Sequence, residues 1–256
     1  MSIIFKVLIF WYSLTSFFKR KILVKNIGKD DLVLDVGSGD KPFWRADVIV
    51  DKYLQDDQQR HSGAVVNDKR KIFIEGDVER LPFKDKVFDF VFCSHLLEHV
   101  ENPDMAIAEL VRVAKRGYIE VPYAIVDLLM PFPPHLWFCF YKKDTLIFHQ
   151  KEKEKNILIH DTERFGKIFY NSSLVQYLFA KDYKSIFITL YWRNNLKYSV
   201  TRVKNPYRYI YKEELHEKTL FIKISFVLYK IFYFFITGLL YKKKKIDIDK
   251  LLLIKE

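Results

Sequence analysis

Short apolar runs alternate with polar and helical stretches through the middle of the chain. Each run ends near a small or acidic residue, which is typical of a buried strand in a parallel sheet. Pro103 opens a stretch with apolar residues at helical spacing, so we expect a helix over 103–114. Strands that alternate with helices predict an α/β fold with right-handed crossovers. The expected parallel strands are 32–37, 47–51, 71–77, 88–94 and 117–122.

Beyond residue 122 the pattern predicts two hairpins and a helix. Aromatic-rich runs on either side of 142–144 predict a β-hairpin, inserted between the fifth and sixth strands and lying over the site. A helix is expected over 172–183, with Ser172 or Ser173 as its cap. The runs on either side of 193–195 predict a second hairpin, which would supply the last two strands of the central sheet.

The two ends of the chain are both apolar and basic. Residues 3–18 and 220–241 are mostly apolar. Polar residues recur every seven positions, at Lys6, Ser13 and Arg20 and at Lys223, Lys230 and Thr237, which predicts helices with a narrow polar stripe. We expect them to lie in the plane of the cell membrane on its cytoplasmic face, where Lys242–Lys245 would add attraction to anionic lipids. A single membrane span over 220–241 is one alternative, and packing on the protein's own core is another.

Composition changes this picture in two ways. The net charge is +11, yet residues 31–122 hold thirteen basic against eighteen acidic residues, so the positive charge lies in the flanks. An acidic centre does not favour a nucleic-acid partner. The chain has two cysteines, Cys93 and Cys139, which indicates a reducing compartment rather than a disulfide-stapled fold.

The chemistry is expected at the carboxyl ends of the parallel strands, where ligands bind in open α/β sheets. Gly37 and Gly39 follow the first strand and let a ligand approach the backbone. Asp51 ends the second strand, where a carboxylate can accept both ribose hydroxyls, and Asp77 follows the third. A phosphate-binding loop is excluded because no Gly-Lys-Ser/Thr is present, so the pocket suits a nucleoside.

Three motifs together carry a family resemblance: LVLDVGSGDKPF, VIVDKY, and IEGDVERLPFKDKVFDFVFCSHLLEHVENPDMAIAELVRV. This stretch, about 30–122, resembles the class I S-adenosylmethionine-dependent methyltransferases, and most of all their small type 11 methyltransferase-domain proteins. The resemblance implies a Rossmann-like, doubly wound sheet of seven strands, with S-adenosylmethionine as cofactor. It also implies that Asp35, Gly37 and Gly39 line the methionine, Asp51 holds the ribose, Asp77 and the Val78 backbone hold the adenine, and Ser94 closes the pocket.

The chain departs from the family pattern in the first loop. Lys41, followed by Pro42, stands where the family has its third glycine, and only eleven residues separate Gly39 from Asp51. That interval is too short for a full crossover helix. We therefore expect a turn around 43–46 in its place.

The pentad His95-Leu-Leu-Glu98-His99 matches a zinc-peptidase pattern. Such a peptidase needs the pentad in mid-helix, whereas here it begins directly after a predicted strand, so we expect no metal. His95 and His99 are instead candidates for the general base of methyl transfer, with His135 as a third candidate. The alternative is that these histidines only hydrogen-bond loop backbone.

These observations predict an N-terminal apolar helix in residues 1–29, a methyltransferase domain over 30–205 with an insertion at about 123–170, and a basic C-terminal segment over 206–256. The expected function is S-adenosylmethionine-dependent methyl transfer at the inner face of the membrane. The acceptor would be small or lipid-linked, of glycan or isoprenoid type. A non-catalytic membrane-bound nucleoside-binding scaffold and an RNA methyltransferase are the remaining alternatives.

Overall fold

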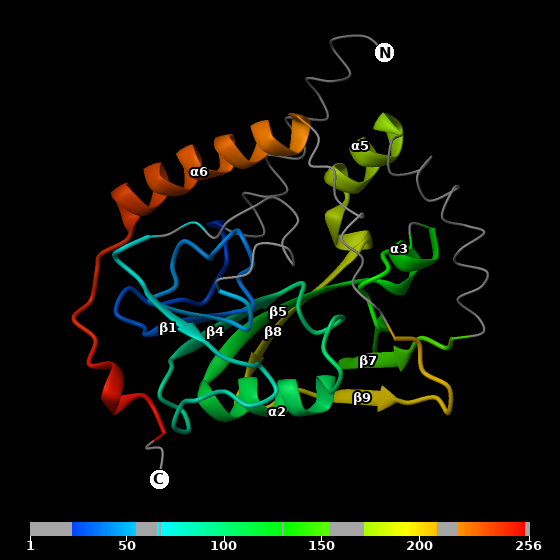
Figure 1. Ribbon diagram of the computed structural model, residues 1–256, viewed down its shortest axis with the longest axis horizontal. Helices are drawn as coiled ribbons and strands as arrows, with labels where there is room; N and C mark the ends of the chain where they lie inside the picture. Colours follow the sequence, from blue (N-terminus) through cyan, green and yellow to red (C-terminus); the bar gives the residue numbers. More distant parts are fainter. Residues whose placement is uncertain are drawn as a thin grey trace.

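A six-stranded sheet forms the centre of the molecule, with strand order β3-β2-β1-β4-β5-β8 and only β8 antiparallel (Figure 1). The computed structural model describes residues 22–54, 66, 68–129, 131–153, 172–208 and 220–253. The α/β Rossmann-like fold class and the five expected parallel strands are confirmed. The strands are β1 (Val33–Val36), β2 (Val48–Asp51), β3 (Ile72–Glu75), β4 (Phe90–Ser94), β5 (Arg116–Pro122) and β8 (Phe187–Arg193).

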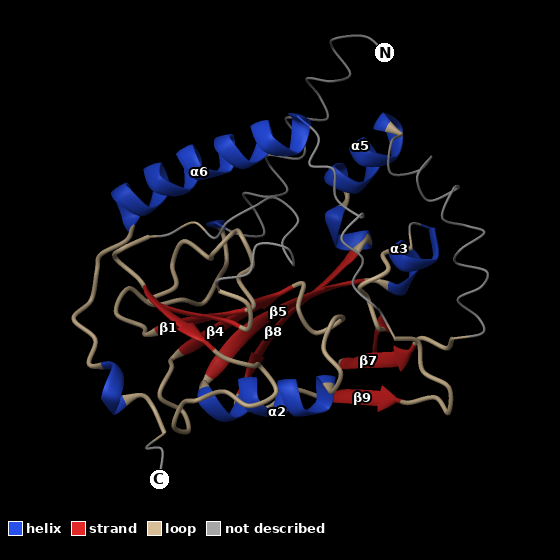
Figure 2. Cartoon of the chain, in the orientation of Figure 1, coloured by secondary structure: helices blue, strands red, loops and turns tan. Residues whose placement is uncertain are grey.

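Helices cover both faces of this sheet (Figure 2). Helix α2 (Pro103–Val113) follows the predicted span and packs on one face through a stripe at helical spacing. The other face carries an aromatic stack, in which Phe43 lies 4.3 Å from Phe92 and Phe92 lies 5.2 Å from Tyr118 between ring centroids. The buried stripe of α2 consists of Pro103, Ala106, Ile107, Leu110 and Val113.

The segment between β1 and β2 contains a turn and no helix, as the short interval predicted. The amide of Phe43 donates to the carboxylate of Asp35 at 2.7 Å, and the amide of Ala46 donates to the carbonyl of Phe43 at 3.1 Å. Phe43 is fully buried in the aromatic stack and replaces the contacts that a crossover helix would make.

The predicted insertion hairpin is present. Strands β6 (Trp137–Lys142) and β7 (Thr145–Gln150) pair antiparallel and follow the short helix α3 (Ala124–Leu129). Lys143 and Asp144 form the two-residue turn, and both have positive φ, as a type I′ turn requires. The rest of the insertion, 154–171, lies outside the described residues.

The second predicted hairpin is wrong. Strand β9 (Tyr198–Thr201) pairs in parallel with β7 in a separate three-stranded sheet, so the central sheet has six strands among the described residues and not seven. A strand of the central sheet needs an apolar face that packs on the core. The sequence of β9, YSVT, offers little apolar surface, and none of its residues is buried. A tight turn at Asn194, with φ of +61°, ends β8 and directs the chain away.

Helix α5 (Ser173–Lys181) forms where a helix was expected and ends two residues earlier. Ser172 is its N-cap residue, as one of the two predicted choices, although its side chain makes no capping hydrogen bond. Two short 3-10 helices, η2 (Tyr183–Ser185) and η4 (Ile248–Lys250), complete the elements.

Helix α6 (Leu220–Leu240) lies across the side of the sheet opposite α2 (Figure 1). Tyr233 and Thr237 on its inner face are buried, and they bond to Asp68 at 3.2 Å and to Arg70 at 2.6 Å. Packing on the protein's own domain, one of the sequence alternatives, therefore holds for this face. No helix in the described part of the chain has the length and apolarity to cross a membrane. The N-terminal helix predicted for 3–18 lies outside the described residues.

Candidate functional site

The loop after β1 and the end of β2 meet, as the parallel order requires. Gly37 and Gly39 both have positive φ, +69° and +56°, which an L side chain rarely adopts. The amide of Gly39 donates to Asp51 Oδ2 at 2.9 Å, and the amide of Gly37 donates to the carbonyl of Val50 at 2.8 Å. Both glycine amides are thus used within the protein, so the glycines serve through their backbone shape and not as free donors.

Asp35 is buried beneath this loop. Its carboxylate accepts the amide of Phe43, and it is 2% exposed, so it stabilises the far end of the loop from below. The space beside Gly39 is open, since a Cβ placed there would meet no atom within 4 Å. A ligand can therefore lie against this turn, as a methionine moiety would.

Asp51 is half-buried at the end of β2. Its second oxygen accepts the amide of Tyr53 at 3.0 Å. These backbone contacts orient the carboxylate, whose oxygens have two lone pairs each. The structure thus places Asp51 beside the glycine loop, in a position that fits a ribose.

Asp77 has a partner that the sequence analysis missed. Lys52 donates to Asp77 Oδ2 at 2.7 Å, and the amide of Glu79 donates to Oδ1 at 3.0 Å. Burial would raise the pKa of Asp77, but these two donors outweigh it and lower the pKa. Val78, beside it, is buried. An adenine amine would share Asp77 with Lys52. The sequence signal for this contact was that Lys52 directly follows Asp51 at the end of the second strand.

Ser94 ends β4 and is buried against another residue that sequence reasoning missed. Its hydroxyl donates to Glu120 Oε1 at 3.0 Å, and Tyr118 donates to Glu120 Oε2 at 2.7 Å. Glu120 is 1% exposed and lies inside β5. A single acid within an otherwise apolar strand was the signal that could have found it.

His95 follows with a left-handed backbone, φ of +56°. Its Nδ1 lies 3.2 Å from Glu98 Oε1 and its Nε2 lies 3.1 Å from Glu120 Oε1. Burial lowers the pKa of His95, but the two carboxylates outweigh burial and raise it. An imidazolium held between two carboxylates is a poor proton acceptor, so this geometry disfavours the general-base role predicted for His95.

His99 and His135 lie together on the other side of Glu98. Their rings are 4.7 Å apart between centroids, and each Nε2 lies 3.9 Å from Glu98 Oε1. Burial lowers the pKa of His99 to about 4, below the range of a general base that works near neutral pH. The pentad lies in a turn and on no helix, which removes the premise of the peptidase alternative.

A buried ion pair supports His135 from behind. Asp127, on α3, accepts from His135 Nδ1 at 2.8 Å and from Lys151 Nζ at 3.0 Å. Burial would raise the pKa of Asp127, but His135 and Lys151 lower it. Sequence reasoning missed both Asp127 and Lys151. An acid alone in the apolar run AIVDLL was the signal for the first.

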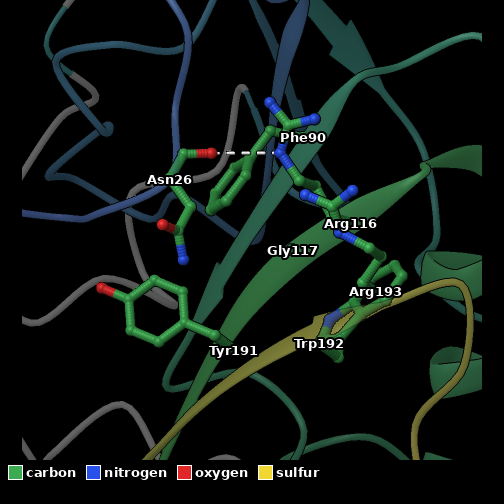
Figure 3. A pocket seen from close by; sticks show the side chains of 7 residues that line it. All are labelled: Asn26, Phe90, Arg116, Gly117, Tyr191, Trp192 and Arg193. Atoms are coloured by element: carbon green, nitrogen blue, oxygen red, sulfur yellow. Dashed lines mark hydrogen bonds between the residues drawn. The ribbon is translucent and has the colours of Figure 1, made fainter.

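The hollow drawn in Figure 3 lies at the opposite end of the sheet. It encloses about 220 Å³ and is lined by residues at the amino ends of β4 and β5, where Arg116 Nε donates to the carbonyl of Asn26 at 3.0 Å. Ligands of open α/β sheets bind at the carboxyl ends, so this hollow does not belong to the candidate site.

Residues 34–119 match the methyltransferase-domain family. This part of the chain is similar to methyltransferase domains. The match runs from within β1 to within β5 and includes every cofactor residue that the resemblance implied, from Asp35 to Ser94. The residues present also fit the cofactor, because the carboxylate of Asp51 meets an open glycine turn at the carboxyl edge of the sheet.

The curated relatives that match include several demethylmenaquinone methyltransferases. That of Roseiflexus sp. is 29% identical over 120 residues, covering 43% of this chain and 49% of the relative. That of Thermobifida fusca is 37% identical over 93 residues, covering 34% of this chain and 39% of the relative. The chain thus spans half or less of the length of these relatives.

Solved structures with a similar fold include the MccD protein. It has a TM-score of 0.37 and 18% identity, covering 72% of this chain and 97% of that chain. A S-adenosylmethionine-dependent methyltransferase of Thermotoga maritima has a TM-score of 0.33 and 21% identity, covering 46% of this chain and 54% of that chain.

Replacing Gly39 with alanine tests whether the open space at this turn holds the cofactor. Gly39→Ala should weaken S-adenosylmethionine binding about tenfold, because the new Cβ enters the space left for the ligand. The positive φ costs about 1–2 kcal/mol of folding stability in addition. Isothermal calorimetry and thermal unfolding measure the two effects separately. Gly238→Ala, also with open space around its Cβ but on α6, is the control and should bind normally.

Proposed function

We propose that the protein is an S-adenosylmethionine-dependent methyltransferase acting at a membrane surface on a small or lipid-linked acceptor of isoprenoid type. The observation that carries the proposal is the contact between Asp51 and the glycine turn at the carboxyl edge of the sheet. That contact unites two of the three family motifs in one site.

The chain's own residues bind and orient the substrates. Asp51 and Asp77 would accept the ribose hydroxyls and the adenine amine, and Gly39 leaves room for the methionine. The bound cofactor supplies an electrophilic methyl group. Ser94 and Glu120 form the polar floor at the ends of β4 and β5, and the insertion that carries His135 lies beside them.

The acceptor class rests on the relatives and on the surface of α6. The relatives named above are demethylmenaquinone methyltransferases, which supports an isoprenoid-type acceptor. The outer face of α6 supports a lipid setting, because its apolar side chains are exposed while its inner face packs on the domain. These exposed residues are Val227, Ile231, Phe234, Phe235, Leu239 and Leu240.

An in-plane helix fits these contacts better than a span. Tyr233, Ile236 and Tyr241 are buried on the domain, so the inner side of the helix is not available to lipid. The basic cluster after α6 is weaker than the sequence predicted, because Lys244 pairs with the buried Asp47 at 2.9 Å. Lys242, Lys243 and Lys245 remain exposed and would each add about 1 kcal/mol toward an anionic leaflet.

Methyl transfer is tested with the full chain, methyl-labelled S-adenosylmethionine and a lipid extract that contains demethylated isoprenoid quinones. Label should enter the organic phase, and Asp51→Ala should reduce it strongly. Cofactor binding without label in any lipid or polar fraction would contradict the enzymatic proposal and favour the nucleoside-binding scaffold.

Membrane contact is tested by replacing three outer residues of α6. The triple variant Ile231→Ser, Phe235→Ser and Leu239→Ser should bind anionic vesicles more than about tenfold less well, because each side chain contributes about 1.5–3 kcal/mol when buried. Vesicle sedimentation measures this. Met105→Ser is the control, since Met105 is 51% exposed on α2, on the opposite side of the sheet.

The wild-type protein should also leave the vesicles in part at high salt or in carbonate, which distinguishes an in-plane helix from a span released only by detergent. A wild-type chain that stays wholly in the supernatant would contradict the membrane proposal and leave the cofactor assignment standing.

A further inference from the structure

We infer that Glu98, His99 and His135 form a binding site for a divalent transition-metal ion of the zinc class, with an open position on the His99 side. The three side chains each offer one ligand atom, and these atoms all lie within 4.8 Å of one another. Two histidines and one glutamate are a ligand set that zinc uses in catalytic sites.

The hydrogen bonds fix which nitrogen of each imidazole points at the centre. His99 Nδ1 lies 3.2 Å from the carbonyl of Pro134, which can only accept, so Nδ1 carries the proton. His135 Nδ1 lies 2.8 Å from the carboxylate of Asp127, which has the same consequence. In the neutral rings both Nε2 atoms therefore present lone pairs toward Glu98. Outer hydrogen bonds of this kind are what orient metal-binding histidines.

Glu98 supplies the second, independent observation. Its side chain is fully buried, and Oε2 has no hydrogen-bond partner among the described residues, whereas Oε1 faces His95. A buried carboxylate oxygen without a donor is costly, by about 1–3 kcal/mol or more for a charged group. Two imidazole nitrogens thus face the Glu98 carboxylate, and a cation bound between the three side chains would also compensate the charge on the unpartnered Oε2.

The distances are compatible with such an ion after a small contraction. Ligand atoms around a tetrahedral zinc, with bonds of about 2.0–2.2 Å, lie roughly 3.3 Å apart. Each Nε2 now lies 3.9 Å from Glu98 Oε1, and all three ligand atoms lie within 4.8 Å of one another, so each pair needs to close by at most about 1.5 Å. Local charge favours this, because Glu98, Asp127 and Glu120 are three buried acids, and the described cations paired with them are Lys151 and His95.

This site differs from the zinc-peptidase pattern and reverses the sequence-based expectation of no metal. The peptidase pattern pairs His95 with His99, but His95 points to Glu120 and Glu98 instead. His135, more than thirty residues away in the sequence, takes its place.

The exposed side of the site, next to His99, would allow the bound ion to take a fourth ligand. His99 is 31% exposed in its side chain, against 10% for His135 and none for Glu98, so a fourth ligand would approach past His99. We assign this position to an oxygen of the methyl acceptor, whose pKa a divalent cation would lower; this use rests on the proposed function, and the ion site does not.

The test is zinc binding by the full chain after treatment with a chelator. Competition with a chromophoric chelator should give one Zn²⁺ per chain, and Co²⁺ should give the strong visible absorption of a low-symmetry site. His135→Gln, Glu98→Gln and His99→Gln should each weaken Zn²⁺ binding more than about a hundredfold, since loss of an outer-shell group alone costs about 10- to 100-fold. Excess Mg²⁺, which prefers oxygen ligands, should not displace Zn²⁺.

His149→Gln is the matched control, because this histidine lies exposed on β7 and should leave Zn²⁺ binding unchanged. Circular dichroism confirms that each variant folds, and His99, the most exposed ligand, keeps the test decisive should the buried variants not fold. No stoichiometric Zn²⁺ in the wild type, or equal affinity in folded His99→Gln, would overturn the site. S-Adenosylmethionine binding and methyl transfer are measured separately, so their failure leaves the ion site intact.

Discussion

Asp51→Ala is expected to weaken S-adenosylmethionine binding about tenfold to a hundredfold. The carboxylate accepts the amide of Gly39 at 2.9 Å and that of Tyr53 at 3.0 Å, which aims it at the open glycine turn. Charge-assisted hydrogen bonds to two ribose hydroxyls contribute about 1.5–3 kcal/mol, which corresponds to that loss. Calorimetry on the full chain measures the dissociation constant.

A 2′-deoxy analogue of the cofactor separates the ribose contact from loss of loop structure. Asp51→Asn keeps only one acceptor oxygen for the two amides of Gly39 and Tyr53 and removes the charge, so it should bind more weakly than the wild type, as Asp51→Ala does. The wild type should discriminate against 2′-deoxy analogues of the cofactor, and Asp51→Ala should not. Asp77→Ala should weaken binding to a similar degree but retain that discrimination. Unchanged affinity in folded Asp51→Ala would contradict the ribose assignment.

Asp47→Ala should lower the free energy of unfolding by about 3–5 kcal/mol, because it removes a fully buried carboxylate and leaves the partly buried cations Arg45 and Lys244 without their counter-charge. Asp47 is fully buried and accepts from the Val33 amide at 3.0 Å, from Tyr241 at 3.1 Å and from Lys244 at 2.9 Å. Arg45 approaches the same carboxylate at 3.5 Å. Such a loss is a large share of the 5–15 kcal/mol that stabilises a typical domain.

Urea unfolding of Asp47→Ala and of Asp85→Ala makes the comparison. Asp85 pairs with Arg112 at 2.8 Å but has 74% of its side chain exposed, so its removal should cost no more than about 1 kcal/mol. Equal effects of the two substitutions would contradict the structural role of Asp47. They would also show that the segment after α6 is not tied to the domain through Lys244 and Tyr241.

The sequence was sufficient to predict the part of the site formed by the glycine loop and Asp51, because their positions follow from the order of the strands. Val36 pairs with Val50 in register, so the loop after β1 must meet the end of β2, and Asp51 lies beside Gly39 for that reason. Apolar spacing likewise predicted α2 nearly to the residue. These features depend on neighbours along the chain or on the regular pairing of parallel strands.

The rest of the site depends on contacts between distant segments. Glu120 looked like one residue of an apolar strand, and only the fold shows that Ser94, His95 and Tyr118 surround it. His135 reaches Glu98 because the insertion folds back over the end of β4, which no local pattern specifies. The sequence analysis assigned β9 to the central sheet, which is wrong. Its pairing depends on its polar, exposed side chains and on the edge of β7 that is available to it.

The central claim is that the carboxyl edge of β1, β2 and β3 holds S-adenosylmethionine. Its most direct test is a calorimetric titration of the full-length wild-type protein with S-adenosylhomocysteine, the demethylated form of the cofactor. The account predicts saturable binding of one molecule per chain, with competition by S-adenosylmethionine. A folded protein that gives no binding heat and no thermal stabilisation with either compound would contradict it.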